Sequence, residues 1–262
     1  MGRFRVIERI GSGGMGTVYR AFDERLQRQV ALKEVHALDP SRVLREAQAA
    51  ARLNHPAIVT LYELGERDGR AVLVSELVPG DTLAHLGSDG RLCDRDVAEI
   101  AADLCDGLAH AHERGVVHRD VKPQNVIVRD ELAAGRRAKL MDFGIARVAD
   151  AATLTATGEV VGTLAYMSPE QLRGEDLTFD CDVWALAMIA YEMLTGSHAF
   201  ATQAAHHVAA ARQGMPREDT SALTPGVQRF FDRALATRTA DRPASVASFI
   251  AAFERALDLS VS

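Results

Sequence analysis

The chain has 262 residues with a formal net charge of -6, and 47% of them are hydrophobic and 25% charged. This composition is typical of a soluble globular protein, and the length suffices for one large domain or for two lobes that share a cleft. The acidic balance offers no basic surface for a nucleic acid, so we expect no nucleic-acid partner. The chain has no run of about 18 apolar residues, so we expect no membrane segment in it.

The N-terminal part of the chain is predicted to be rich in β-strand. Five short runs have often alternating apolar positions between turn residues, namely 4–11, 16–23, 29–35, 58–65 and 71–77. The turn-like pair Asp68-Gly69 separates the last two runs. A helix is predicted at 42–53, where strong helix formers have helical spacing, and Val78-Pro79-Gly80-Asp81 is the predicted hinge.

Helices are predicted to dominate the rest of the chain. Apolar residues at three- and four-residue steps predict a helix at 97–115, and amphipathic helices are predicted at 227–236 and 246–257. The segment 183–196 is apolar nearly all round, which predicts a buried helix. Strands first and helices afterwards favour an α+β fold over a doubly wound α/β sheet.

A glycine-rich segment, Gly11–Val18, lies between the first two predicted strands. It lacks the helix that a dinucleotide-binding glycine motif needs directly after it, and it lacks the Gly-Lys-Ser/Thr of a Walker loop. Glycines in a hairpin would allow the backbone to lie close over phosphate groups. Taken alone, the segment is compatible with a nucleotide loop or with an ordinary glycine-rich turn.

The most specific motif is the segment His118-Arg119-Asp120-Val121-Lys122-Pro123-Gln124-Asn125. Phosphoryl transfer needs a carboxylate to accept or steer the hydroxyl proton, a cation near the moving phosphoryl group and an oxygen ligand for a metal ion. Asp120, Lys122 and Asn125 supply one of each within one short loop. The alternative for a polar segment is a solvated turn, and this spacing disfavours it.

Charged residues in two further segments complete the pattern. Lys33 lies among apolar neighbours in a predicted strand, where an inward-pointing ammonium group would need a partner, and Glu46 can supply one. The alternative for Lys33 is a solvated charge at the edge of the strand. Asp142-Phe143-Gly144 follows the strand-like Lys139-Leu140-Met141, and its carboxylate is a candidate ligand for Mg²⁺.

With these motifs in this order, the chain resembles the protein kinase family, and most closely the bacterial Hanks-type (eukaryotic-like) Ser/Thr protein kinases. The resemblance covers nearly the whole chain. Ser168-Pro169-Glu170 stands where the family has Ala-Pro-Glu, Asp182 begins the buried helix, and Arg242 matches the Arg that pairs with that Glu. The resemblance implies a two-lobed α+β kinase fold, with a β-rich N-lobe at 1–77, a helical C-lobe at 78–262 and an ATP cleft between them.

The resemblance implies a catalytic role for the loop residues. Asp120 is the expected catalytic base, and Lys122 is expected to stabilise the transferring phosphoryl group. Thr163 matches the Thr that bonds the catalytic Asp and Lys in Ser/Thr kinases. Structural roles are implied for Arg119, Glu170, Asp182 and Arg242.

The resemblance also implies how the nucleotide is held. Lys33, paired with Glu46, would hold the α- and β-phosphates of ATP. Asn125 and Asp142 would bind Mg²⁺, or Mn²⁺ in its place. The implied ATP-binding residues are Ile10, Gly11, Ser12, Gly13, Gly14, Gly16, Val18, Ala31, Lys33, Ser75, Glu76, Val78, Ile127, Met141 and Asp142.

The segment that follows Asp142 is expected to be an activation loop, and it contains Thr153, Thr155 and Thr157. Similar bacterial kinases autophosphorylate at the positions of Thr155 and Thr157, so we expect phosphate there, with Thr153 as a further phosphosite. In the family, the Arg before the catalytic Asp often pairs with such a phosphate, so Arg119 would order the loop. The alternative is that threonine is simply common in a mobile polar loop.

Three features depart from the family pattern. The stretch between Lys33 and Glu46 is short, which implies that the regulatory helix has lost its first turns. Ser75 stands at the gatekeeper position behind adenine, where larger residues are commoner, so we expect an open back pocket that accepts bulky ATP-site ligands. Ala50 is small at the packing position of the helix, which loosens the helix and favours activation by a partner.

Other functions remain as alternatives. Within the fold they are a partner-activated kinase and an ATP-binding pseudokinase scaffold, although a scaffold would normally have lost Lys33, Asp120 or Asp142. A small-molecule phosphotransferase is another enzyme class, but Ser168-Pro169-Glu170 and the Thr-bearing loop favour protein substrates. His206-His207 suggests a metal site, yet a solvated pair accounts for it, because no carboxylate or cysteine partner is near in the sequence.

Partners and location are expected from the resemblance and from the ends of the chain. Protein substrates are expected, and a homodimer through the N-lobe is one option, since family members often dimerise there. The N-terminus has no signal-peptide core, so we expect a cytoplasmic protein or the intracellular domain of a membrane-anchored receptor kinase. Cys93, Cys105 and Cys181 form neither a metal spacing nor a disulfide framework, which is typical of a reducing compartment.

Overall fold

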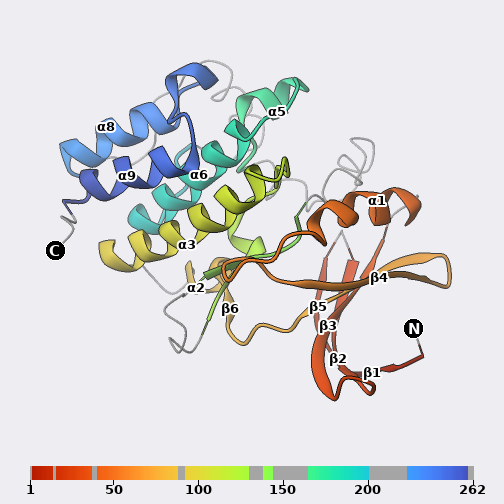
Figure 1. The fold of residues 1–262 in the computed structure, drawn as a ribbon. Helices are drawn as coiled ribbons and strands as arrows, with labels where there is room; N and C mark the ends of the chain where they lie inside the picture. The colour runs from red at the N-terminus through yellow and green to blue at the C-terminus, as the bar shows by residue number, and fades with distance from the viewer. Residues whose placement is uncertain are drawn as a thin grey trace.

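Five antiparallel strands form a sheet in the N-terminal part of the molecule, in the spatial order β1-β2-β3-β5-β4 (Figure 1). They are β1 (Phe4–Gly13), β2 (Gly16–Asp23), β3 (Arg28–Val35), β4 (Leu61–Arg67) and β5 (Arg70–Glu76). The computed structural model describes residues 2–13, 16–36, 40–87, 92–129, 138–143, 165–200 and 223–258, without the side chains of Pro40, Arg42, Arg45 and Glu46. All five predicted strands are confirmed, although β4 begins three residues later than predicted.

Alternation along the strands separates the two faces of this sheet. A buried apolar cluster covers one face, made of Phe4, Ala21, Val30, Leu32, Val72 and Val74. Side chains at the intervening positions, such as Val18, Ala31 and Lys33, line a cavity on the other face. This division follows from the period of two in a β-strand, where successive side chains point to opposite faces.

The connection between β4 and β5 is the predicted turn at Asp68-Gly69. Both residues have positive φ, 50° for Asp68 and 72° for Gly69. A two-residue hairpin turn of type I′ requires positive φ at both positions, and Asp-Gly is a preferred pair for it. The turn prediction is therefore confirmed.

Helix α1, Pro40–Ala50, packs against β4 and β5. It buries Val43 and Ala47 completely against the sheet. The predicted continuation of this helix to Leu53 is wrong. Leu53 instead leaves the helix and is buried in the large apolar core that also contains the C-terminal helices.

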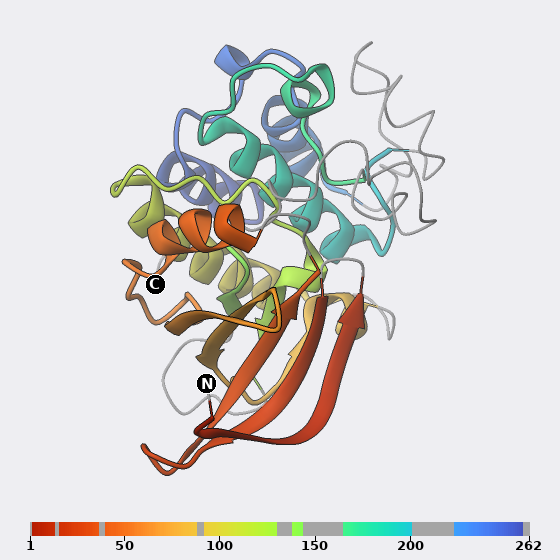
Figure 2. The same ribbon diagram turned by 90° about the vertical axis from the view of Figure 1, so that its right-hand side faces the viewer.

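Helices surround this core in the C-terminal lobe, on the far side of the molecule from β1 and β2 (Figure 2). They are α2 (Leu83–Gly87), α3 (Asp94–His112), α5 (Pro169–Arg173), α6 (Asp180–Thr195), α8 (Pro225–Ala234) and α9 (Val246–Ala256), with 3-10 turns at Pro123–Asn125 and Thr239–Asp241. A small sheet has the order β6 (Asp81–Thr82), β7 (Val126–Val128) and β8 (Ala138–Leu140). No helix within the described ranges is long and apolar enough to cross a bilayer.

The central helices agree with the sequence pattern except at their ends. Nearly every side chain of α6 is buried, as its apolar sequence predicts, and α3 packs between α6 and α9. The start of α3 is three residues earlier than predicted, because the Cys93 thiol accepts a hydrogen bond from Asp96 N at 3.4 Å and caps the helix. The end of α3 is also earlier than predicted, since Gly115 lies in a turn after His112.

The connection between α1 and β4 ties the two lobes together. Val59 N donates to Leu140 O at 2.8 Å, and Leu140 N donates to Ala57 O at 2.9 Å. The same connection lies against α3 at Gly107. These contacts hold β8 beside the N-terminal lobe, and Asp142 follows β8 directly in the chain.

Candidate active site

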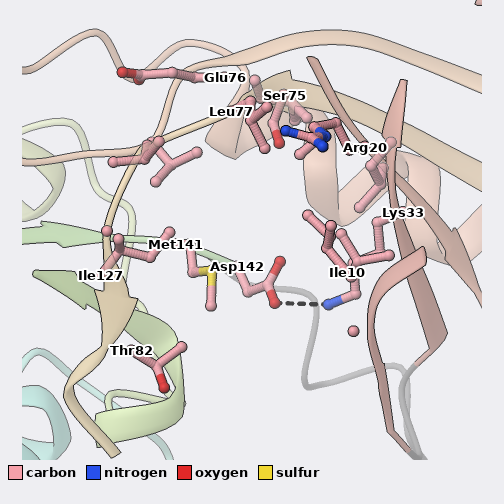
Figure 3. Close-up of a pocket in the computed structure, with 18 of the residues that line it drawn as sticks. Ile10, Arg20, Lys33, Ser75, Glu76, Leu77, Thr82, Ile127, Met141 and Asp142 are labelled. Carbon is pink, nitrogen blue, oxygen red and sulfur yellow. Dashed lines mark hydrogen bonds and ion pairs between the residues drawn. The ribbon is translucent and has the colours of Figure 1, made fainter. Parts of the chain in front are cut away.

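A cavity of about 710 Å³ lies between the five-stranded sheet and the C-terminal lobe (Figure 3). Most of the predicted ATP-binding residues line it, namely Ile10, Gly11, Val18, Ala31, Lys33, Ser75, Glu76, Val78, Ile127, Met141 and Asp142. Ser12, Gly13 and Gly16 are described but do not belong to this lining, and Gly14 lies outside the described residues. The fold thus gathers into one cavity side chains that are far apart in the sequence.

The cavity is also lined by residues that the motif analysis did not identify. Glu8 and Arg20 form an ion pair there, and Gln29 lies in the same wall. Each of the three stands two residues from a predicted cavity residue on the same strand, so the strand period would have identified them. Leu77 and Thr82, on either side of the predicted hinge, also line the cavity (Figure 3).

The cavity reaches past Ser75 toward helix α1. Ala50 of α1 belongs to the lining, together with Ile58, Leu73 and Phe143. The small side chains of Ser75 and Ala50 leave this region open, which fits the expected back pocket. Acceptance of bulky ligands in it stays a prediction.

Gly16 begins β2 with a φ of 150°, a conformation that other residues rarely adopt. A Cβ atom at this position would collide with the backbone carbonyl of Glu34 on the neighbouring strand. The glycine is therefore required for the close approach of β2 to β3. The start of β2 therefore lies directly beside the end of β3, the strand that carries Lys33.

The predicted catalytic trio is brought together in the loop before β7. Asp120 is buried, and its Oδ2 lies 2.9 Å from Lys122 Nζ. The Asn125 amide nitrogen donates to Asp120 Oδ2 at 2.9 Å and to Asp120 O at 2.8 Å. The 3-10 turn at Pro123–Asn125 makes these contacts possible, because it returns Asn125 toward the start of the loop.

Lys33 and Asp142 form an ion pair inside the cavity, with 2.6 Å between Lys33 Nζ and Asp142 Oδ2 (Figure 3). Asp142 has a positive φ of 64°, which is unusual for a residue other than glycine. Glu46 lies in α1, but its side chain lies outside the described part of the structure. The Lys33–Glu46 pair therefore stays a prediction.

The arrangement of Asn125 and Asp142 fits a hard divalent metal ion. The Asn125 amide nitrogen is bound to Asp120, so the amide oxygen is the atom that would bind a cation. Asp142 adds carboxylate oxygens, and the Met141 N–H donates to Asn125 O at 3.0 Å, which joins the two segments. Mg²⁺ is commonly held by one or two protein oxygen ligands together with substrate phosphates and water. Within the described ranges, no cluster of three His, Cys, Asp or Glu side chains forms a further metal site.

Asp182, at the start of α6, holds the backbone of the predicted catalytic loop, residues 118–125. Its buried carboxylate accepts from Arg119 N at 2.8 Å and from His118 N at 2.9 Å. His112 Nε2 lies 2.8 Å from the same carboxylate. These three contacts agree with the structural role predicted for Asp182. The sequence carried no signal for His112.

His118 connects the catalytic loop to the segment that carries Asp142. Its fully buried ring accepts from Asp120 N through Nδ1 at 3.3 Å and lies 3.0 Å from Met141 O through Nε2. The two contacts fit the tautomer with hydrogen on Nε2. The ring also lies against Phe143, with 4.4 Å between the centroids.

Glu170 and Arg242 form a buried bidentate ion pair. Arg242 Nη1 and Nη2 donate to the two Glu170 carboxylate oxygens at 2.7 and 2.8 Å. Burial alone would raise the pKa of Glu170, but the hydrogen bonds and charge of Arg242 hold that pKa below its ordinary value. Arg242 also lies over the ring of Trp184, 4.9 Å from its centroid. The two residues predicted to pair are therefore in contact.

Several predicted residues lie outside the described part of the chain, namely Thr153, Thr155, Thr157, Thr163, Gly144 and the pair His206-His207. Their predicted roles stay predictions.

The chain matches the family model "Protein kinase domain" over residues 4–252. It is 40% identical over 249 residues to the serine/threonine-protein kinase PknL of Mycobacterium tuberculosis, which covers 92% of this chain and 61% of PknL. It is 43% identical over 210 residues to PknB of Mycobacterium leprae, 76% of this chain and 33% of PknB. The chain thus spans only part of the length of these relatives.

A solved structure shows the same fold. The crystal structure of the PknI kinase domain of Mycobacterium tuberculosis superposes with a TM-score of 0.75 at 27% identity, over 97% of this chain and 96% of that chain. The family match, the relatives and this superposition agree with the five-stranded sheet, the helical lobe and the cavity between them. The chain belongs to the protein kinase domain family.

Proposed function

We propose that this chain transfers the γ-phosphoryl group of ATP to serine or threonine hydroxyls of proteins. One observation carries the proposal: the cluster of Asp120, Lys122 and Asn125 is joined through Met141 to the Lys33–Asp142 pair at the wall of the cavity. Phosphoryl transfer needs a positioned carboxylate, cations and metal ligands rather than covalent chemistry from the protein. This cluster supplies all three.

Asp120 is the proposed base. Its Oδ2 accepts from both Lys122 and Asn125, so we assign Oδ1 to the substrate hydroxyl. Asp120 would accept or steer the hydroxyl proton while Lys122 stabilises the negative charge on the transferring group. A divalent cation, when bound, would neutralise charge on the phosphates.

Lys33 and Asp142 are the proposed phosphate and metal ligands. In this structure they neutralise each other at 2.6 Å. Binding of ATP with Mg²⁺, or with Mn²⁺, would give Lys33 phosphate oxygens and Asp142 the metal ion as new partners. Adenine would lie between Val18, Ala31 and Ile127, within reach of the backbone of Glu76 and Val78.

The choice of serine and threonine rests on similarity. The relatives PknL and PknB are named serine/threonine-protein kinases. Lys122 stands where Ser/Thr kinases have Lys, and Thr163 matches the Thr typical of that group.

We further propose that residues 1–77 and 78–262 form the two lobes. We also propose that the N-lobe surface around Val6 and Ile7, both exposed, forms a homodimer contact.

Arg119 supports the proposed autophosphorylation. Its Nε is buried and has no hydrogen-bond partner within the described part of the chain. A buried donor of this kind favours an anion, and a phosphate on Thr155 or Thr157 would supply one. Such a contact would order the activation segment and raise activity.

The test is to incubate the purified protein with Mg²⁺ and ATP and to map phosphosites by intact-mass and peptide mass spectrometry. Phosphate is expected on Thr155 or Thr157, and none is expected in Asp120→Asn. Measurable ATP binding without any phosphate in the wild type would contradict the proposal. That outcome would favour a partner-activated kinase or a scaffold.

A further inference from the structure

The peptide unit that joins Arg119 to Asp120 is held at both of its ends. Its amide group, Asp120 N, donates to His118 Nδ1 at 3.3 Å. Its carbonyl, Arg119 O, accepts from the side-chain nitrogen of Gln171 at 2.9 Å. Because a peptide unit is planar, these two bonds together set its orientation. That orientation determines where the Cβ atom and carboxylate of Asp120 point.

These two hydrogen bonds are needed because the backbone of Arg119 is strained. Its φ is 67°, in the left-handed region that residues other than glycine seldom adopt. On the other side of Arg119, its own N–H donates to Asp182 at 2.8 Å. Side chains from α5, α6 and the loop itself therefore hold the backbone in a conformation that it would not keep by itself.

Gln171 is itself rigidly held, which makes it suitable for this task. Its amide oxygen accepts from Ser168 N at 2.9 Å and from Ser168 Oγ at 3.1 Å. Ser168 Oγ in turn accepts from Gln171 N at 3.4 Å, so the two residues form the capping box of α5. The oxygen of the Gln171 side-chain amide thus holds the start of α5, and its nitrogen holds the Arg119 carbonyl in the predicted catalytic loop.

We infer that Gln171 is a positioning residue for Asp120, and that it couples the start of α5 to the catalytic loop. The inference rests on the proposed function, in which Asp120 is the base. Loss of the Gln171 donor leaves the Arg119 carbonyl without its partner and lets the peptide unit rotate. Asp120 then points away from the substrate hydroxyl more often, while the ATP cavity is unchanged.

The decisive variant is Gln171→Glu, with Arg173→Ala as the control. Glutamate at this position of a capping box still accepts from Ser168 N, but it has no N–H for Arg119 O. Arg173 lies on the same short helix and pairs with Glu175 at its surface. Gln171→Met is a second variant, which keeps the side-chain length and removes the whole amide.

Steady-state kinetics with a Ser/Thr peptide library as acceptor separate positioning from binding. In Gln171→Glu we expect kcat to fall about tenfold, which is the rate equivalent of one net hydrogen bond. The KM for ATP and the melting temperature should stay close to those of the wild type. Gln171→Met should lose at least as much kcat, and Arg173→Ala should lose none. If the wild type is active and Gln171→Glu has the same kcat as the wild type, the inference is overturned.

Hydrogen exchange gives a measurement that does not depend on activity. Amides in residues 116–122 should exchange faster in Gln171→Glu than in the wild type or in Arg173→Ala. Unchanged exchange would overturn the inference. An inactive wild type would contradict the proposed function alone, and the exchange experiment would still decide the role of Gln171.

Discussion

Two residues at the candidate site have backbone conformations that are uncommon outside glycine. Arg119 and Asp142 have φ values of 67° and 64°, and each adjoins or carries a proposed catalytic carboxylate. Such conformations cost roughly 1–3 kcal/mol each and persist only where surrounding contacts impose them. The Asp182 carboxylate accepts a hydrogen bond from the N–H of Arg119, and Lys33 forms an ion pair with the Asp142 side chain. The strain is located where the direction of a carboxylate matters for the proposed transfer.

The Glu170–Arg242 pair makes a testable contribution to stability. Both side chains are buried, so Glu170→Gln would leave Arg242 as a buried charge without its counterion. We expect the variant to lose about 3–5 kcal/mol of unfolding free energy at pH 7. Urea unfolding followed by circular dichroism measures this loss.

The same pair predicts a dependence on pH. The pKa of Glu170 is lowered in the folded protein, so its stabilisation is present above the unfolded pKa of about 4.3 and is lost as the pH falls through the folded value. The difference in stability between the wild type and Glu170→Gln should therefore shrink as the pH falls below about 4. A difference that stays constant over this range would contradict the assigned role of the carboxylate.

At the scale of elements, helix α3 packs closely against the connection between α1 and β4 at Gly107, which has no side chain. A Cβ atom on Gly107 would lie 3.1 Å from Ala57 O and 3.4 Å from Ile58 Cγ1, which are part of the connection that binds β8. We expect Gly107→Val to destabilise the protein by about 1–3 kcal/mol through overpacking. The shift of the connection should also weaken ATP binding, because β8 leads to Asp142.

Asp106→Val is the matched control for Gly107→Val. Asp106 is the neighbouring residue on the exposed side of the same helix, so its substitution introduces no new contact to the connection. Thermal unfolding and ATP titration of both variants would separate the two effects. Equal losses in the two variants would show that the contact at Gly107 is not tight.

At the scale of the whole molecule, the candidate site is built from both lobes. Lys33 comes from the sheet, Asp142 follows β8 in the small sheet, and the cavity lies between the lobes. A ligand that binds both lobes stabilises the folded state by mass action, by about 2.7 kcal/mol at one hundred times its Kd. We therefore expect ATP with Mg²⁺ to raise the melting temperature by roughly 5–10 °C, and ATP with a chelator to raise it less.

Asp142→Asn should remove most of the difference between ATP with Mg²⁺ and ATP with a chelator, because the carboxylate is a proposed metal ligand. The control is Asp176→Asn, which changes an exposed carboxylate between α5 and α6. Differential scanning fluorimetry measures both variants. A metal-dependent shift of wild-type size in Asp142→Asn would count against Asp142 as the metal ligand.

Local spacing in the sequence determined much of the fold and of the site. Asp120, Lys122 and Asn125 are separated by a few residues, so a single short turn brings them into contact, as the motif predicted. The strand periods and the Asp68-Gly69 turn could be predicted from the sequence because they depend on neighbouring residues alone. The buried character of α6 followed from its apolar sequence in the same way.

Apart from the Glu170–Arg242 pair, which the family resemblance implied, contacts between distant segments were decided by the tertiary structure. Gln171 reaches Arg119 across 52 residues, and His112 reaches Asp182 across 70, although no local pattern marks either pair. The end of α1 was also set at this level, because Leu53 leaves the helix to enter the core of the other lobe. Such contacts depend on how packed helices place their side chains, and a hydrogen bond forms only within a few tenths of an ångström. The sequence by itself therefore predicted the chemical groups of the candidate site, while packing decided which partners hold them in position.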